Sequence, residues 1–280
     1  MSKIKIVTDS TSDLSKEIIR KFNIEVIPLS VSIDGETYLD GVDISPSEFM
    51  EKMKEAKELP KSSQPAVGKF LELYDQLCLQ GYDVISIHLS TGLSGTVGSA
   101  ESAAQMSKCN VTVVDSKFIS KALSFQVIEA AKMAENGSTV EEIISRLDEI
   151  QKHSHLYVVV DTLENLVKGG RIGRGKALIG SLLKIKPIAS LTDGVYTPVA
   201  NARSHAQVVS FLTEQFVKDS EGKKVKDIGI VHANGLELAK KLSDSIKKIS
   251  GYVSIEVVDT TPIIGTHTGP GAIGFMYYAE

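Results

Sequence analysis

Short apolar runs alternate with longer segments of mixed character along the first half of the chain. The runs "IKIVTDS" (4–10), "DVISIHL" (83–89) and "NVTVVD" (110–115) are rich in apolar residues. Segments with helical character follow these runs, among them 94–106 and 118–137. Strands that are apolar on both faces are typical of a parallel sheet covered by helices on both sides. The pattern therefore predicts an α/β fold with such a sheet in this half.

Capping and turn residues place helix starts and tight turns. Ser45 and Glu48 fit a capping box, in which a serine and a glutamate three residues later satisfy backbone N–H groups at a helix start. Ser138 and Glu141 fit the same box at the start of a later helix. The "DG" pair at 34–35 predicts a hairpin turn between two short strands.

The pattern changes near residue 155, where helical segments become fewer and strands predominate. The strands predicted after this point are "HLYVVV" (155–160), "KPIASLTDG" (186–194), "VYTPVA" (195–200), "DIGIVHA" (227–233) and "SIEVVD" (254–259). "LTDGVY" (191–196) reads as a hairpin turn between two of them. We expect a mixed sheet with helices on one face, and two domains, 1–155 and 156–280, with a ligand at their interface.

Length and charge narrow the class of protein. A chain of 280 residues favours two domains over a single core. The net charge is −4 and the basic residues are scattered, which excludes the positive patch that nucleic-acid binders use. No stretch approaches the roughly 18 apolar residues of a membrane span, and the first ten residues lack an export signal. We expect a cytoplasmic monomer without a transmembrane segment, since no sustained apolar heptad pattern indicates self-association.

Several familiar catalytic and binding motifs are incomplete. "GLSGT" (92–96) lacks the last glycine of a nucleophile elbow because Thr96 stands there. "GPGAIG" (269–274) spells a dinucleotide-binding pattern, but only six residues follow it, too few for the helix that this motif needs. No phosphate-binding loop of the G-x-x-x-x-G-K-[ST] type occurs, and "HSH" (153–155) has no third metal ligand nearby. We therefore expect no metal and no cofactor.

Four glycine- or hydroxyl-rich segments in predicted loops remain. They are "KSSQP" (61–65), "LSTGLSGT" (89–96), "VKGGRIGRG" (167–175) and "IGTHTGPGAIG" (264–274). Loops at strand ends are where binding sites are usually built. Ser94 and Gly95 open a predicted helix, where free N–H groups and the helix dipole favour an anion. A plain helix cap would account for Ser94 alone.

Three further residues in these segments have both a structural and a ligand-binding interpretation. Ser62 lies one residue outside the cap position that Ser63 would occupy, and so it is freer to meet a ligand. His267 stands among glycines, where it either caps a turn or donates a hydrogen bond to a carboxylate. Arg171 follows a helix whose C-terminus favours a cation, but the surplus of glycines around it indicates a close approach to this backbone.

Together these segments resemble the DegV family of bacterial fatty-acid-binding proteins, which act with a fatty acid kinase. The resemblance covers the whole chain, with seven motifs in the order and approximate spacing of the family. They are "TDSTSDL" (8–14), "SSQP" (62–65), "LSGT" (93–96), "VDS" (114–116), "GGRI" (169–172), "IKPI" (185–188) and "HTGPGA" (267–272).

The resemblance implies a Rossmann-like first domain and a mixed-sheet second domain, with a long-chain fatty acid bound between and within them. It implies a carrier without catalytic activity, in which Ser94, Ser62 and His267 hold the lipid carboxylate. It also implies that Arg171 lies near the ligand head and that Arg203 serves the partner, a kinase that phosphorylates the carboxylate to an acyl phosphate for phospholipid synthesis. Family members often have threonine where Ser62 stands, so this chain keeps the hydroxyl and lacks a methyl group.

Two other functions stay open at this point. A lipid hydrolase or acyl transferase would use Ser94 as nucleophile and His267 as base, with Asp9 or Asp115 at strand ends to orient the histidine. A kinase subunit that binds a small ketone is suggested only by analogy of fold with dihydroxyacetone kinases. The apolar positions in 178–188 favour a greasy ligand over a triose.

Overall fold

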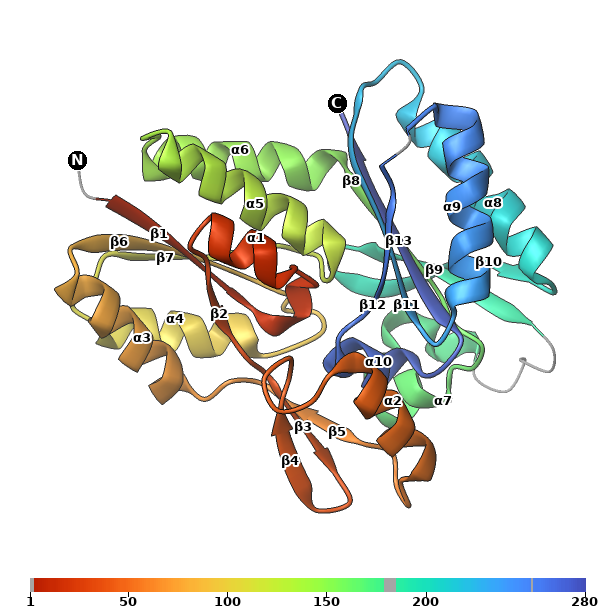
Figure 1. Ribbon diagram of the computed structural model, residues 1–280, viewed down its shortest axis with the longest axis horizontal. Coiled ribbons are helices and arrows are strands. Elements are labelled where there is room, and N and C mark those ends of the chain that lie inside the picture. The colour runs from red at the N-terminus through yellow and green to blue at the C-terminus, as the bar shows by residue number, and fades with distance from the viewer. Residues whose placement is uncertain (1–2, 179–184, 253) are drawn as a thin grey trace. The chain divides into compact units, whose positions relative to one another are not determined.

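A computed structural model describes residues 3–178, 185–252 and 254–280 of the chain (Figure 1). The chain divides into two compact units: unit 1 comprises 1–30 and 62–152, and unit 2 comprises 31–61 and 153–280. The units are discontinuous in sequence, unlike the predicted domains 1–155 and 156–280. The sequence pattern does not predict that 31–61 groups with the later half of the chain.

Unit 1 is a parallel α/β unit. Its elements are β1 (Lys3–Asp9), a 3-10 turn η1 (Ser10–Ser12), α1 (Lys16–Lys21), β2 (Glu25–Ile27), β5 (Lys61–Ser63, at the passage from unit 2), α3 (Val67–Leu79), β6 (Tyr82–His88), α4 (Thr96–Met106), β7 (Val111–Asp115), α5 (Lys121–Glu135) and α6 (Val140–His153). The sheet has the order β2-β1-β6-β7, and every neighbouring pair is parallel.

Helices cover both faces of this sheet, as the apolar strand pattern predicts (Figure 1). Helices α3 and α4 pack on one face through a core that includes Val7, Val84, Phe70 and Ala100, and α5 packs on the other. The chain builds outward from β1 in one direction to β2 and in the other to β6. Such a reversal of strand order opens a crevice at the carboxyl ends of the strands, where α/β proteins usually bind ligands.

Unit 2 is built on a larger mixed sheet. Its elements are β3 (Ser30–Ile33), β4 (Glu36–Leu39), α2 (Pro46–Glu55), β8 (Ser154–Val159), α7 (Glu164–Lys168), a 3-10 turn η2 (Gly173–Leu178), β9 (Lys186–Thr192), β10 (Val195–Ala202), α8 (His205–Ser220), β11 (Val225–Ala233), α9 (Leu236–Ser250), β12 (Glu256–Asp259), α10 (Pro262–Thr268) and β13 (Ala272–Ala279). The sheet has the order β10-β9-β8-β13-β11-β12, in which only β11 and β12 are parallel neighbours.

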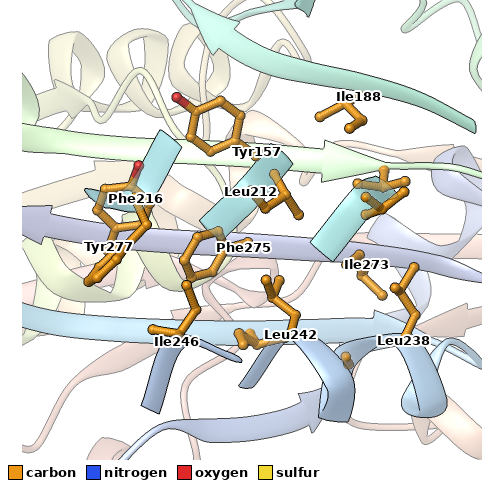
Figure 2. Packing of buried hydrophobic residues seen from close by; sticks show 14 of the residues in the cluster. Tyr157, Ile188, Leu212, Phe216, Leu238, Leu242, Ile246, Ile273, Phe275 and Tyr277 are labelled. Atoms are coloured by element: carbon orange, nitrogen blue, oxygen red, sulfur yellow. The ribbon is translucent and has the colours of Figure 1, made fainter. Parts of the chain in front are cut away.

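Alternate residues of the central strands in unit 2 pack on opposite faces. Phe275 and Tyr277 of β13 point to the face covered by α8 and α9, together with Phe216 and Leu242 from those helices (Figure 2). The residue between two such positions faces the other way in a strand. The second face carries Ala272 in a core shared with Leu166 of α7 and with Ile172, which precedes η2. Helices α8 and α9 thus cover one face, as expected, and the short helix α7 adds Leu166 to the smaller core on the other face.

Segment 31–61 joins unit 2 through helix α2. An added Cβ at Gly265 of α10 would lie 3.2 Å from the ring of Phe49 and 3.6 Å from the sulfur of Met50, both on α2. The absence of a side chain at Gly265 thus permits close packing of the two helices. Phe49 is almost fully buried, which explains why this excursion of the chain groups with residues more than 200 positions later.

Most of the local signals are confirmed. The hairpins at Asp34–Gly35 and Asp193–Gly194 form, with all four residues at positive φ, as a two-residue turn of this type requires. The capping box of Ser45 and Glu48 is present. The box predicted at Ser138 and Glu141 was wrong by one residue, because Thr139 and Glu142 exchange the hydrogen bonds at 2.8 and 3.3 Å.

Within the described part of the chain, no helix combines the length and the apolar character that a membrane crossing requires.

Candidate functional site

The loop that follows β6 lies at the reversal of strand order in unit 1. It carries Ser94, whose backbone N–H donates to the carbonyl of Ser90 at 3.1 Å. The Ser94 hydroxyl lies 2.9 Å from that of Thr96 and accepts from the Thr96 N–H at 3.3 Å. Ser94 therefore contacts the first turn of α4, but the N-cap position belongs to Gly95 and not to Ser94 as a plain helix cap would require. Its hydroxyl lies at a helix N-terminus, which is favourable for an anion.

The "SSQP" and "LSGT" segments meet within unit 1. The Gln64 side-chain amide donates to the Ser99 hydroxyl at 2.8 Å, and a Cβ at Gly95 would lie 2.2 Å from the Gln64 Oε1. Gly95 thus leaves room for the amide of Gln64 over the start of α4. Ser62 lies on β5, two residues before Gln64, and is half-buried.

His267 lies on α10 in unit 2, beside the "GGRI" segment. A Cβ at Gly169 would lie 2.3 Å from the His267 Nδ1, so glycine at this position permits the ring to approach the backbone. Arg171 donates to the carbonyl of Gly169 at 2.6 Å. The Asn165 side-chain amide donates to the backbone carbonyl of Thr266 at 3.0 Å and ties α7 to α10. The structure therefore brings two of the predicted segments together in this unit.

The electrostatics of His267 follow from this packing. Burial lowers the pKa of His267, and the positive charge of Arg171 lowers it further, to about 4. Both causes disfavour the imidazolium form. A neutral imidazole beside an arginine is suited to hydrogen-bond an anion, and an incoming carboxylate would favour protonation of the ring.

Arg203 lies in the turn between β10 and α8, also in unit 2. Its backbone N–H donates to the Gln207 side chain at 2.7 Å, and its own side chain is exposed. It borders a surface pocket of about 260 Å³ that Gln207, Asn201 and Phe211 also line. This environment provides polar groups for a partner to contact.

Sequence reasoning missed several residues that organise these two regions. Gln64 stands inside the "SSQP" motif, and its amide within that hydroxyl-rich motif is the signal that could have identified it. Asn165 had no signal, because an asparagine within "TLENLV" resembles any surface helix position. Asp9 and Asp115 were considered only as partners for His267. Asp9 instead accepts from the His88 ring at 3.0 Å, and Asp115 accepts from the Thr91 hydroxyl and the Lys117 ammonium.

Two further observations concern metal binding and the apolar segment 178–188. No group of three or more histidine, cysteine or acidic side chains among the described residues is placed to hold a metal ion. Of the apolar segment 178–188, residues 179–184 lie outside the described part of the chain.

A parallel α/β unit and a mixed-sheet unit, each with one of these polar clusters, define a two-unit α/β protein of known type. The family model described as "Uncharacterised protein, DegV family" matches residues 3–280. The chain belongs to the DegV family.

Relatives and solved structures match over the full length of the chain. A DegV domain-containing protein of Listeria monocytogenes is 47% identical over 281 residues, which is 100% of both chains. A crystal structure of DegV from Bacillus subtilis, titled a fatty acid binding protein, is 36% identical with a TM-score of 0.91. A DegV family protein from Thermus thermophilus, whose structure is titled for fatty acid binding, is 32% identical with a TM-score of 0.92. Each structure covers 100% of both chains.

Proposed function

We propose that this protein is a non-enzymatic carrier that binds a long-chain fatty acid and presents its carboxylate to a separate fatty acid kinase. The observation that carries the proposal is the meeting of "SSQP" with "LSGT", which sets Gln64 over Gly95 and places Ser94 at the N-terminus of α4. The fatty-acid-binding DegV proteins of B. subtilis and T. thermophilus support the ligand class.

The chemistry of the ligand divides between its tail and its head. About 14 buried methylene groups at roughly 0.8 kcal/mol each contribute on the order of 11 kcal/mol before the costs of association. A carboxylate removed from water without partners would take up a proton, so it needs hydrogen-bond donors. Among the proposed donors, Ser62, Ser94 and Gly95 belong to unit 1, and His267 and Arg171 belong to unit 2. The head group then sets orientation more than affinity.

Presentation to a kinase explains why a carrier needs an oriented head group. A carboxylate oxygen of the lipid attacks the γ-phosphorus of ATP, the bond to ADP breaks, and an acyl phosphate forms. The nucleotide belongs to the partner, since this chain has no phosphate-binding loop sequence. Because the partner uses ATP, the proposal places the carrier in the cytoplasm. Arg203 is exposed and is proposed to contact the partner.

Mass spectrometry of the purified protein under denaturing conditions tests the ligand class. We expect a co-purified fatty acid of long chain at close to one equivalent, and release of the lipid should lower the thermal midpoint. Delipidated protein should rebind palmitate or oleate. A lipid-free preparation that also fails to bind added palmitate and oleate would overturn the proposed function.

Mutations at Ser94 and Arg203 should separate lipid binding from transfer. Ser94→Ala removes a hydrogen-bond donor to the head group, and we expect a loss of roughly 1–3 kcal/mol of lipid-dependent stabilisation. Arg203→Ala should leave lipid content and stability close to wild type, because an exposed arginine contributes little to the fold. Its defect should appear as lost acyl phosphate, trapped with hydroxylamine after adding kinase and ATP. Parallel loss of lipid and phosphorylation in Arg203→Ala would contradict this division.

A further inference from the structure

A chain of buried hydrogen bonds runs through unit 1 and is not used by the proposed head-group site. The Tyr74 hydroxyl donates to the Ser86 hydroxyl at 2.8 Å, and Ser86 lies 2.7 Å from the His88 Nε2. The His88 Nδ1 lies 3.0 Å from the Asp9 Oδ2. All four side chains have no exposed surface. This hydrogen-bond network runs from α3 through β6 to the carboxyl end of β1.

One arrangement of hydrogens along this network satisfies every donor and acceptor. Burial raises the pKa of Tyr74 above its usual value, so its hydroxyl keeps the proton that it donates to Ser86. The single hydrogen of Ser86 is then available for the His88 Nε2, which accepts. In this arrangement the hydrogen of the ring lies on Nδ1, from which it is donated to Asp9. Each donor thus meets one acceptor, as a buried polar network requires.

Asp9 is the last residue of this hydrogen-bond network, and its two carboxylate oxygens accept four hydrogen bonds. Its Oδ1 accepts from the backbone N–H of Thr11 at 3.0 Å and from the Thr11 hydroxyl at 2.6 Å. Its Oδ2 accepts from the His88 Nδ1 and from the backbone N–H of Leu89, both at 3.0 Å. A carboxylate is the side chain that accepts at all four places and donates at none.

The bond to Leu89 connects this network to the head-group loop. Leu89 is the first residue after β6, and the next residue, Ser90, donates its N–H to the Phe118 carbonyl at 2.8 Å. The Ser90 carbonyl in turn accepts the N–H of Ser94 at 3.1 Å. Asp9 therefore holds the first residue of the loop, and the residue after it, Ser90, holds Ser94 through one backbone hydrogen bond.

We propose that Asp9 and His88 are positioning residues that set the conformation of the 89–95 loop for recognition of a carboxylate. This inference rests on the proposed function, in which Ser94 of the 89–95 loop binds the lipid carboxylate. A buried network with a purely structural role would stabilise unit 1 as a whole. A positioning role affects, in addition, how well the protein distinguishes a carboxylate from an uncharged head group on the same tail.

Asp9→Asn tests this role with an isosteric change. An amide has one oxygen and one NH2 group, so either orientation of the asparagine sets a donor against the donors of Thr11 or against that of Leu89. The readout is the ratio of the Kd for methyl palmitate to the Kd for palmitate, measured on delipidated protein. We expect Asp9→Asn to lower this ratio on the order of tenfold and to act non-additively with Ser94→Ala.

Asp219→Asn is the matched control in unit 2. Asp219 also accepts from two hydroxyls, those of Tyr157 at 3.0 Å and Tyr277 at 2.7 Å, and it belongs to unit 2, whereas the 89–95 loop belongs to unit 1. The Asp219→Asn variant should have a lower midpoint of urea unfolding and an unchanged ratio of the Kd for methyl palmitate to the Kd for palmitate. An unchanged ratio in folded Asp9→Asn would overturn the positioning role.

A second pair of variants keeps the test decisive if Asp9→Asn does not fold. His88→Asn places an amide NH2 near the Nδ1 position and keeps the donor to Asp9, whereas His88→Gln places it near Nε2 and removes that donor. We expect His88→Gln to lower the ratio and His88→Asn to retain it, and equal ratios would overturn the proposal. Wild-type protein that binds palmitate no more tightly than methyl palmitate would instead refute carboxylate recognition, and with it the proposed function.

Discussion

Between pH 6.5 and pH 4, the wild-type protein should lose stability relative to a His267→Gln variant, by up to about 3 kcal/mol. Burial and the charge of Arg171 lower the pKa of His267 from 6.5 to about 4 in the folded protein. As the pH falls through this window, the unfolded chain takes up a proton that the folded protein does not. The free energy of unfolding of the wild-type protein therefore decreases as the pH decreases. Its difference from that of His267→Gln becomes constant below about pH 4.

Urea unfolding of delipidated protein at several pH values checks this result. The pKa values of His155 and His232 are also lowered by burial, but both proteins contain these residues and their contributions cancel in the difference. In Arg171→Gln, the pKa of His267 should rise only in part, because burial is the larger cause. A pH-independent difference between wild type and His267→Gln would contradict the burial of the ring.

Replacing Phe275 with alanine should destabilise unit 2 by about 3–5 kcal/mol. The Phe275 ring is fully buried and lies 5.0 Å from the Tyr277 ring and 6.1 Å from the Phe216 ring, between centroids (Figure 2). These aromatic neighbours are held by β13 and α8, so they collapse only partly into the space that the mutation leaves. The lost contacts and the cavity both contribute to the cost.

Hydrogen exchange of the β11 and β13 amides measures this effect within unit 2. Val217→Ala is the control, because Val217 follows Phe216 on α8 but is 52% exposed, and its truncation should change stability by less than about 0.5 kcal/mol. Phe275→Leu should cost less than Phe275→Ala because it leaves a smaller cavity. Equal effects of Phe275→Ala and Val217→Ala would show that this cluster does not dominate the core.

Local features of this fold are determined by the sequence alone. The hairpin at Asp193–Gly194 forms because the two residues adopt positive φ between two strands, a preference that acts over four positions. The capping box of Ser45 and Glu48 likewise involves one helical turn. The apolar runs predicted the parallel sheet of unit 1 because burial on both faces leaves no polar alternation.

Choices between equivalent local signals needed tertiary packing. Ser138–Glu141 and Thr139–Glu142 both fit a capping box and differ by one residue. The helix takes the second, and in that helix Ile143, Leu147 and Ile150 are buried. The two capping boxes have nearly the same energy. The burial of these apolar residues therefore decides which of the two boxes forms.

The contacts that build the candidate site depended on the tertiary structure. Gln64 covers Gly95 across 31 positions, and His88 bonds Asp9 across 79, although no periodicity links these residues. The motifs predicted which loops carry ligand-binding side chains, because hydroxyls and glycines mark them locally. The contact of His88 with Asp9 is decided by the order of strands in the sheet, since β1 and β6 are neighbours only after the chain has folded. Hydrogen bonds between their ends form only when that pairing brings donor and acceptor within about 3 Å.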